Sequence, residues 1–63
     1  MTLIEFASLD INAQANTVWN GAYVSTRVVD DHYVELYDLD SFFVEVIYDP
    51  FTNRIIDIRP GIF

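Results

Sequence analysis

At the centre of the sequence stands one apolar run, Ser41-Phe42-Phe43-Val44-Glu45-Val46-Ile47-Tyr48-Asp49. The run is rich in aromatic and β-branched residues, and turn-forming residues bound it on both sides, which is typical of a β-strand. Alternate residues from Phe42 to Tyr48 form an unbroken apolar row, whereas Glu45 interrupts the other row. The run therefore predicts a central strand over residues 42–48, with one face directed toward a core.

Three further segments, at residues 22–29, 32–38 and 54–59, have the same two-residue periodicity. Clusters of turn-forming residues separate the four segments, and each cluster is too short for the crossover helix that parallel strands require. The connections must then be hairpins. We therefore expect a four-stranded antiparallel meander.

The first twenty residues carry a helical pattern. Thr2 and Glu5 fit a capping box at a helix N-terminus. Asp10 or Asn12 would serve as a second N-cap, so we expect a helix that is bent or broken near residues 8–10 and that ends in a left-handed turn at residues 20–21. The predicted apolar stripe of this helix comprises Ile4, Ile11, Ala15, Val18 and Ala22, flanked by Ala7 and Trp19.

These elements predict a single small α+β domain over residues 1–63, in which the N-terminal helix packs on one face of the antiparallel meander. Side-chain parity fixes the expected register, because a slip of one residue moves every side chain to the other face. If Val44 and Val46 face the core, their partners are Val34 and Leu36 rather than Glu35, across a loop with an odd number of residues.

The same parity argument applies to the two outer hairpins. It predicts a three-residue loop, 30–32, in the first hairpin, and it places Asn53 in the left-handed conformation in the last one. The expected pairs of the last hairpin are Tyr48–Arg54, Val46–Ile56 and Val44–Ile58. The predicted core face comprises Val24, Val28, Val34, Leu36, Phe42, Val44, Val46, Tyr48, Ile56 and Ile58.

The opposite face of the sheet is predicted to be an interface. It would carry tyrosines, a phenylalanine and isoleucines among charges of both signs, and this composition is typical of protein–protein contacts. Soluble monomers seldom expose so large an apolar patch. The candidate interface comprises Tyr23, Arg27, Tyr33, Glu35, Tyr37, Phe43, Glu45, Ile47, Ile55, Asp57 and Arg59.

The length of the chain also favours association. A chain of 63 residues buries only about 60% of its unfolded surface, which leaves a small core. The sequence contains no cysteine and a single histidine, so neither a disulfide framework nor a structural zinc site is expected to supplement that core. Oligomerisation is the remaining common supplement. We therefore expect a homo-oligomer, most simply a dimer, or a complex with another protein.

The charge of the chain narrows the class of partner. Ten acidic residues against three arginines give a net charge of −7, so we expect phosphate backbones and anionic membranes to repel the chain. Nucleic acid and membrane partners are therefore not expected. The N-terminus has no basic region, and no segment approaches the roughly 18 apolar residues of a membrane span. These features predict a cytoplasmic protein.

The best cluster of reactive side chains lies at one end of the expected sheet. It contains Asp30, Asp31, His32 and Asp49, whereas Asp38 and Asp40 fall at the opposite end. Aspartates in hairpin loops mostly serve turn geometry, and neither Ser25 nor Ser41 is expected to have a base beside it. We therefore expect no enzyme activity, no catalytic or metal-binding residue and no cofactor. A hydrolase or metal enzyme that uses His32 is the alternative.

A likeness at the level of sequence pattern extends over most of the chain. The chain resembles short bacterial proteins of unknown function that begin with a helix and continue as an aromatic-rich meander, and the resemblance implies the α+β fold alone. The residues that carry it are Gln14-Ala15, Val18-Trp19, Gly21, Leu36-Tyr37, Phe42 to Val46, Tyr48-Asp49 and Asn53-Arg54-Ile55.

Two hypotheses of different classes follow for the function. The first is a small non-enzymatic interaction module that self-associates through its aromatic sheet face, and its association would be insensitive to salt. The second is an acidic inhibitor, such as an antitoxin, an immunity protein or a nucleic-acid mimic, which would form a salt-sensitive complex with a basic partner.

Overall fold

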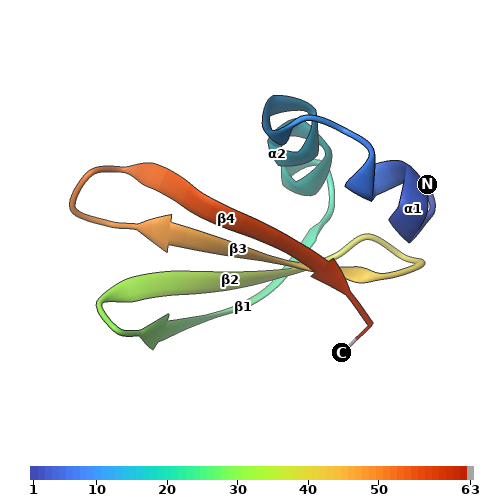
Figure 1. Ribbon diagram of the computed structural model, residues 1–63. Helices are drawn as coiled ribbons and strands as arrows, with labels where there is room; N and C mark the ends of the chain where they lie inside the picture. Colours follow the sequence, from blue (N-terminus) through green and yellow to red (C-terminus); the bar gives the residue numbers. More distant parts are fainter. Residues whose placement is uncertain (63) are drawn as a thin grey trace.

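The computed structural model describes residues 1–62. Its elements are α1 (Leu3–Ala7), α2 (Ile11–Trp19), β1 (Ala22–Val29), β2 (His32–Asp38), β3 (Phe43–Asp49) and β4 (Arg54–Gly61). The strands form one antiparallel sheet in the order β1-β2-β3-β4, and the helices pack on it (Figure 1). The predicted α+β meander with an N-terminal helical region is confirmed. Neither helix is long and apolar enough to cross a membrane.

Two N-caps divide the helical region. The Thr2 hydroxyl accepts a hydrogen bond from the Glu5 N–H at 3.2 Å, and the Glu5 carboxylate accepts one from the Thr2 N–H at 2.8 Å, which completes the predicted capping box. The Asp10 carboxylate accepts from the Ala13 N–H at 2.9 Å and caps α2. The break between the helices therefore lies at residues 8–10, as the sequence predicts.

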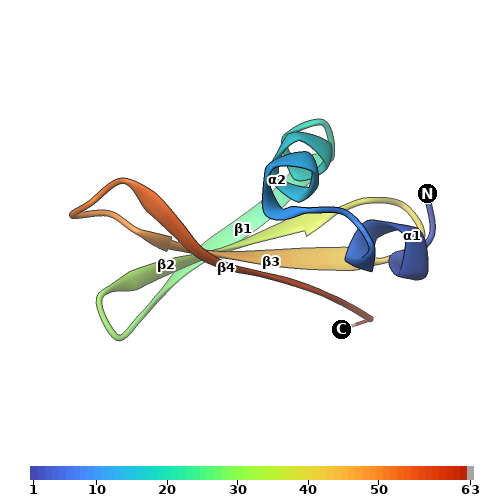
Figure 2. The same ribbon diagram turned by 45° about the horizontal axis from the view of Figure 1, so that its top comes forward.

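The break changes which helical residues reach the core. Phe6, Ala15 and Val18 are buried, whereas Ile4 and Ile11, which belonged to the predicted stripe, are exposed. Trp19 is also exposed. A single apolar stripe requires one continuous helix, and α1 and α2 are two separate helices with different directions (Figure 2). The predicted stripe is therefore wrong at Ile4 and Ile11, and also at Ala22, which is exposed and belongs to β1.

The end of α2 also differs from the prediction. Asn20 has a right-handed φ of −90°, and no glycine within residues 1–62 has a positive φ. Gly21 is needed for close packing instead, because a Cβ atom there would overlap Leu39 Cδ2 and lie 3.2 Å from the carbonyl oxygen of Asp38. The glycine thus allows the C-terminus of α2 to approach the connection between β2 and β3.

The length of the β2–β3 loop shows that the predicted register of these two strands is wrong. Asp38 pairs with Phe43, so the loop has four residues, 39–42, rather than an odd number. Phe42 leaves the strand pattern within this loop and packs against Phe6, with ring centroids 5.5 Å apart. Consequently Val44 pairs with Tyr37 and Val46 with Glu35, while Val34 and Leu36 lie on the opposite face.

The outer hairpins depart from the predicted pairing as well. The first hairpin turns through two residues, Asp30 and Asp31, which have φ values of 49° and 63° and leave His32 in β2. In the last hairpin a bulge at Ile56 shifts the register, so that Val46 pairs with Ile58 and Tyr48 pairs with Ile55. Asn53 has the predicted positive φ, at 61°.

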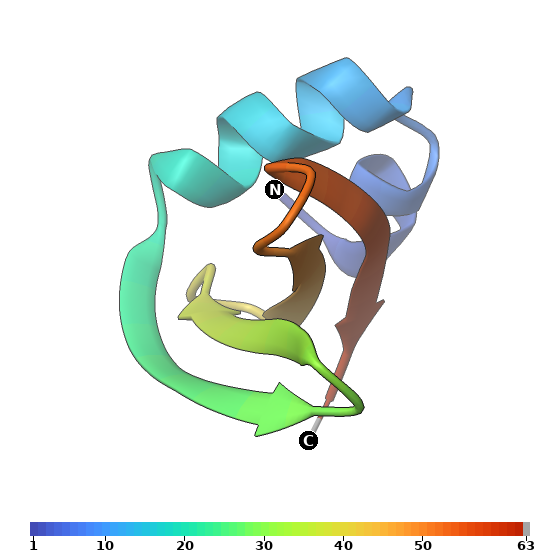
Figure 3. The same cartoon turned by 90° about the vertical axis from the view of Figure 1, so that its left-hand side faces the viewer.

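The core lies between the helices and the β3–β4 half of the sheet. Its buried members are Phe6, Ala15, Val18, Phe42, Val44, Val46 and Ile58. Both helices contact β4, and the β1–β2 hairpin extends away from them (Figures 1 and 3). We call the sheet face with Val44 and Val46 the helix face, and the other the open face. Val24, Val28 and Ile56 of the predicted core face are exposed.

Candidate interaction surface

The first strand is the most exposed element of the sheet. All eight residues of β1 are exposed, although the strand is rich in valine and includes Tyr23. Val28 alone keeps 66% of its surface in contact with solvent. β1 is also an edge strand, since β2 is its one neighbour in the described sheet. An exposed, apolar edge strand presents unpaired backbone groups to which another strand can bind.

The opposite edge of the sheet is better protected. Both helices contact β4. Pro60 lies within β4 and donates no backbone hydrogen bond, and the bulge at Ile56 interrupts the regular edge. These are features that keep an edge from pairing with another chain. β1 carries a bulge at Val24, which leaves the five residues from Ser25 to Val29 as a regular edge.

The direction of the backbone groups along β1 follows from its turn. Val29 and His32 flank the two-residue turn, so they are expected to share its closing hydrogen bond. Hydrogen-bonding direction alternates along an antiparallel strand. The N–H and C=O groups of Arg27 therefore point toward β2, and those of Thr26 and Val28 point away from the sheet.

The charge of the chain is unevenly distributed around this edge. Residues 11–29, which contain α2 and β1, include Arg27 and no acidic residue at all, whereas all ten acidic residues lie elsewhere. β1 is therefore an uncharged to weakly basic edge on a molecule with a net charge of −7. The edge strand itself therefore offers a partner no carboxylate, although Glu35 and Asp38 of β2 lie beside Thr26 and Ala22.

The predicted interface residues do not share one face. The registers place Tyr23, Tyr33, Glu35, Tyr37 and Ile55 on the helix face, and Arg27, Phe43, Glu45, Ile47, Asp57 and Arg59 on the open face. The predicted single aromatic face is therefore wrong. The four-residue β2–β3 loop inverts β2 relative to the assumed parity, and the bulges at Val24 and Ile56 move Tyr23 and Ile55 to the helix face.

The tyrosines of this set gather beside the β1 edge. The rings of Tyr23 and Tyr37 meet edge to face, with centroids 5.8 Å apart. The hydroxyl of Tyr23 also hydrogen-bonds the hydroxyl of Thr26. Partial burial, with Glu35 and Tyr23 nearby, raises the pKa of Tyr37. The helix face of the β1–β2 hairpin is thus an aromatic surface that the helices leave half-covered.

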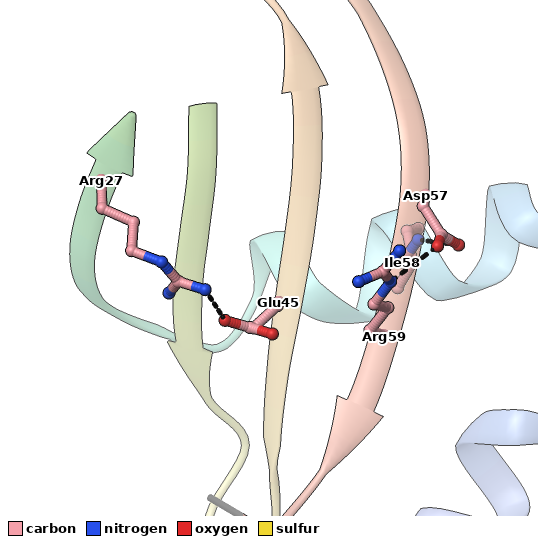
Figure 4. Close-up of polar contacts among 5 residues, drawn as sticks. All are labelled: Arg27, Glu45, Asp57, Ile58 and Arg59. Carbon is pink, nitrogen blue, oxygen red and sulfur yellow. Dashed lines mark hydrogen bonds and ion pairs between the residues drawn. The ribbon is translucent and has the colours of Figure 1, made fainter. Parts of the chain in front are cut away.

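An ion pair spans the open face (Figure 4). The Arg27 guanidinium on β1 lies 2.8 Å from the Glu45 carboxylate on β3, so the pair crosses over β2. Val34 lies on β2 between these two strands and is buried, although it belongs to the open face. The Glu45 side chain is 15% exposed, and that of Arg27 is 59% exposed. The pair fixes the side chain of Arg27 along the sheet.

A second ion pair lies within β4. The Arg59 Nε atom is 2.8 Å from an Asp57 carboxylate oxygen. The hydrogen bond from Arg59, with a further one from the Ile58 N–H, lowers the pKa of Asp57 (Figure 4). A shallow hollow of about 270 Å³ on the open face is lined by residues that include Arg27, Glu45 and Arg59. Because both arginines already contact carboxylates, the hollow offers an anion little uncompensated charge.

The acidic loop cluster is divided by the twist of the sheet. The turn with Asp30 and Asp31 and the turn after Asp49 lie at the same end of the sheet but diverge (Figures 1 and 2). The Phe51 N–H donates to Asp49 at 2.9 Å and is the main reason why the pKa of Asp49 is low, and His32 makes a minor contribution. In residues 1–62 no three His, Cys, Asp or Glu side chains are grouped so as to hold a metal ion.

A groove also separates α2 from the β3–β4 hairpin. It encloses about 690 Å³, and its lining includes Ile11, Trp19, Tyr48, Arg54 and Ile55. Trp19 is one of its lining residues and is exposed.

No family model matches the chain, and comparison with curated proteins and with solved structures finds no match either. The function must therefore be inferred from these surfaces.

Proposed function

We propose that this chain is a small, non-enzymatic protein–protein interaction module that binds an extended strand of its partner at the edge of β1. The observation that carries the proposal is the exposure of all eight residues of β1, whereas β4 at the opposite edge of the sheet is protected. Strand addition of this kind takes its affinity from main-chain hydrogen bonds and its specificity from alternate side chains. The absence of cysteine agrees with the cytoplasmic setting that we also propose.

The neighbouring side chains support binding at this edge. A strand added beside Thr26 and Val28 would cover apolar surface on the helix face, next to Tyr23 and Tyr37. On the open face it would lie beside Arg27, whose position Glu45 fixes. Tyrosine and arginine are the residues that most often dominate the energetics of protein interfaces.

Cross-linking in the native cell tests the proposal. A photoreactive amino acid replaces Thr26 on the β1 edge or, as the control, Ile56 on the β4 edge, since both positions are exposed. We expect a defined protein adduct from position 26 that disappears in the Val28→Lys background, where a charge obstructs strand pairing. Adducts that form equally at both edges, or no adduct at position 26, would refute binding at β1.

The segregation of the acidic residues favours a second candidate function, an acidic inhibitor of a basic protein. All ten acidic residues lie outside residues 11–29, and both ends of the sheet carry aspartates in their turns. Salt distinguishes the candidates, because a complex held by exposed charges weakens as ionic strength rises. An adduct with a basic protein that is lost in high salt would support the inhibitor. An adduct that persists in high salt supports strand addition.

A further inference from the structure

We infer that the strand bound at β1 comes from a second copy of this chain, paired antiparallel about a two-fold axis at Thr26. The inference rests on the proposed function, because it names the occupant of the same edge. In an isologous pairing each copy offers the same surface to the other, so one edge suffices to form a closed dimer. The two sheets would then join into one, and the exposed edge of each would disappear.

The distribution of charge favours a second copy at this position. Two chains that each carry a net charge of −7 repel one another, and the repulsion is least where acidic residues are absent. Residues 11–29 form such a segment, and β1 is the part of it at the sheet edge. With Thr26 opposite Thr26, the acidic turn at Asp30 lies opposite Ala22 of the second copy. The pairing of the two β1 strands therefore places no carboxylate directly opposite another.

Backbone direction and charge together select the register. Residues that bond across the joint must point their backbone groups outward, and in the regular part of β1 these are Thr26 and Val28. A two-fold axis at Arg27 would set two like-charged residues directly opposite one another, which is unfavourable even though each guanidinium is directed across β2 to Glu45 of its own chain. An axis at Val28 would leave little of β1 paired before the turn. An axis at Thr26 aligns Tyr23 to Val29 of the two copies, with the bulge at Val24 opposite Val28, and places Arg27 opposite Ser25 of the second copy.

Disulfide trapping tests this register. The chain contains no cysteine, so each single substitution introduces a unique thiol. Directly opposed residues of a hydrogen-bonded pair lie about 5.5 Å apart at Cα, within the roughly 4.4–6.8 Å that a disulfide spans. In Thr26→Cys the two thiols would be directly opposed. In the control Val28→Cys they would be offset by four residues, or about 13 Å.

We expect mild oxidation of micromolar protein to convert Thr26→Cys to a covalent dimer and to leave Val28→Cys monomeric. Sedimentation equilibrium of the cysteine-free protein supplies an independent readout. Val28→Lys should weaken self-association at least tenfold, whereas Ile56→Lys on the opposite edge should leave it unchanged. Equal trapping at both cysteines, preferential trapping at position 28, or a wild-type chain that stays monomeric at high micromolar concentration would overturn the inference.

The two proposals fail separately. If the purified chain is monomeric and Thr26→Cys is not trapped, but a photoreactive residue at position 26 still captures a different protein in the cell, the second copy is excluded and the edge-binding function stands. If position 26 captures nothing in the cell and no dimer forms in solution, both proposals are refuted.

Discussion

The substitution Val44→Ala gives a quantitative test of which residues form the core. Val44 is fully buried on the helix face of β3, where it pairs with Tyr37 and Pro60. The change Val44→Ala removes two methyl groups, worth about 1.6 kcal/mol of transfer free energy. The residual cavity adds to that loss, so we expect the free energy of unfolding to fall by about 2 to 3 kcal/mol.

That loss is large for a chain of 63 residues, for which about 3 to 9 kcal/mol of total stability is typical. The matched control is Val28→Ala, the same chemical change at a side chain that is 66% exposed. Because only about one third of the Val28 side chain is buried, its truncation should lower the free energy of unfolding by about one third of 1.6 kcal/mol, or about 0.5 kcal/mol.

Urea unfolding, followed by far-ultraviolet circular dichroism, measures both variants. The measurements are made at one low protein concentration, because self-association would add to the apparent stability. With a slope near 1 kcal/mol/M, the midpoint of Val44→Ala should fall by about 2 M or more. Equal midpoints for the two alanine variants would refute the assignment of the helix face.

Three further changes address the helices, the loop contact and the dependence on pH. Phe6→Ala should lower the free energy of unfolding by about 3 to 5 kcal/mol in thermal or urea unfolding, whereas Ile4→Ala, on the exposed side of α1, should change it by less than about 0.5 kcal/mol. Gly21→Ala should lower the melting temperature, because its Cβ overlaps Leu39, and Leu39→Ala should relieve part of that loss. The pKa of Asp49 is lowered from its usual 3.8 by the Phe51 N–H, so this carboxylate stabilises the fold above that pH and ceases to do so as the pH falls through its lower folded value. In Asp49→Asn the free energy of unfolding should therefore fall less steeply between about pH 5 and about pH 2. An unchanged dependence on pH would contradict a stabilising role of the Asp49 carboxylate.

Local patterns in the sequence predict the elements well because each depends on a few neighbouring residues. The capping box of Thr2 and Glu5, the cap at Asp10 and the left-handed Asn53 all occur as expected. All four strands lie within two residues of their predicted bounds. These features rest on hydrogen bonds and backbone angles within single segments.

The register was not predictable in the same way, because it depends on a contact between distant segments. Phe42 continues the strand pattern in the sequence, but its ring packs on Phe6 of α1 and the residue lies in the loop. That contact makes the β2–β3 loop even and exchanges the two faces of β2. The bulge at Ile56 has a similar effect in β4.

One signal in the sequence did point to the exposed edge. The helices have five and nine residues, which is too little to cover four strands, so part of the predicted core face had to remain uncovered. The absence of acidic residues from 11 to 29 marks the same region. Short helices and the acid-free segment mark the region that contains β1, whereas a search for an aromatic face combined residues that lie on opposite sides of the sheet.

Amide hydrogen exchange along β1, read by nuclear magnetic resonance at increasing protein concentration, is the most direct test of pairing at this edge. We predict that the N–H groups of Thr26 and Val28 exchange rapidly in dilute protein and slow markedly as the concentration rises, while Arg27, bonded to β2, is protected throughout. Rapid exchange of Thr26 and Val28 at every concentration would contradict a second copy at the β1 edge.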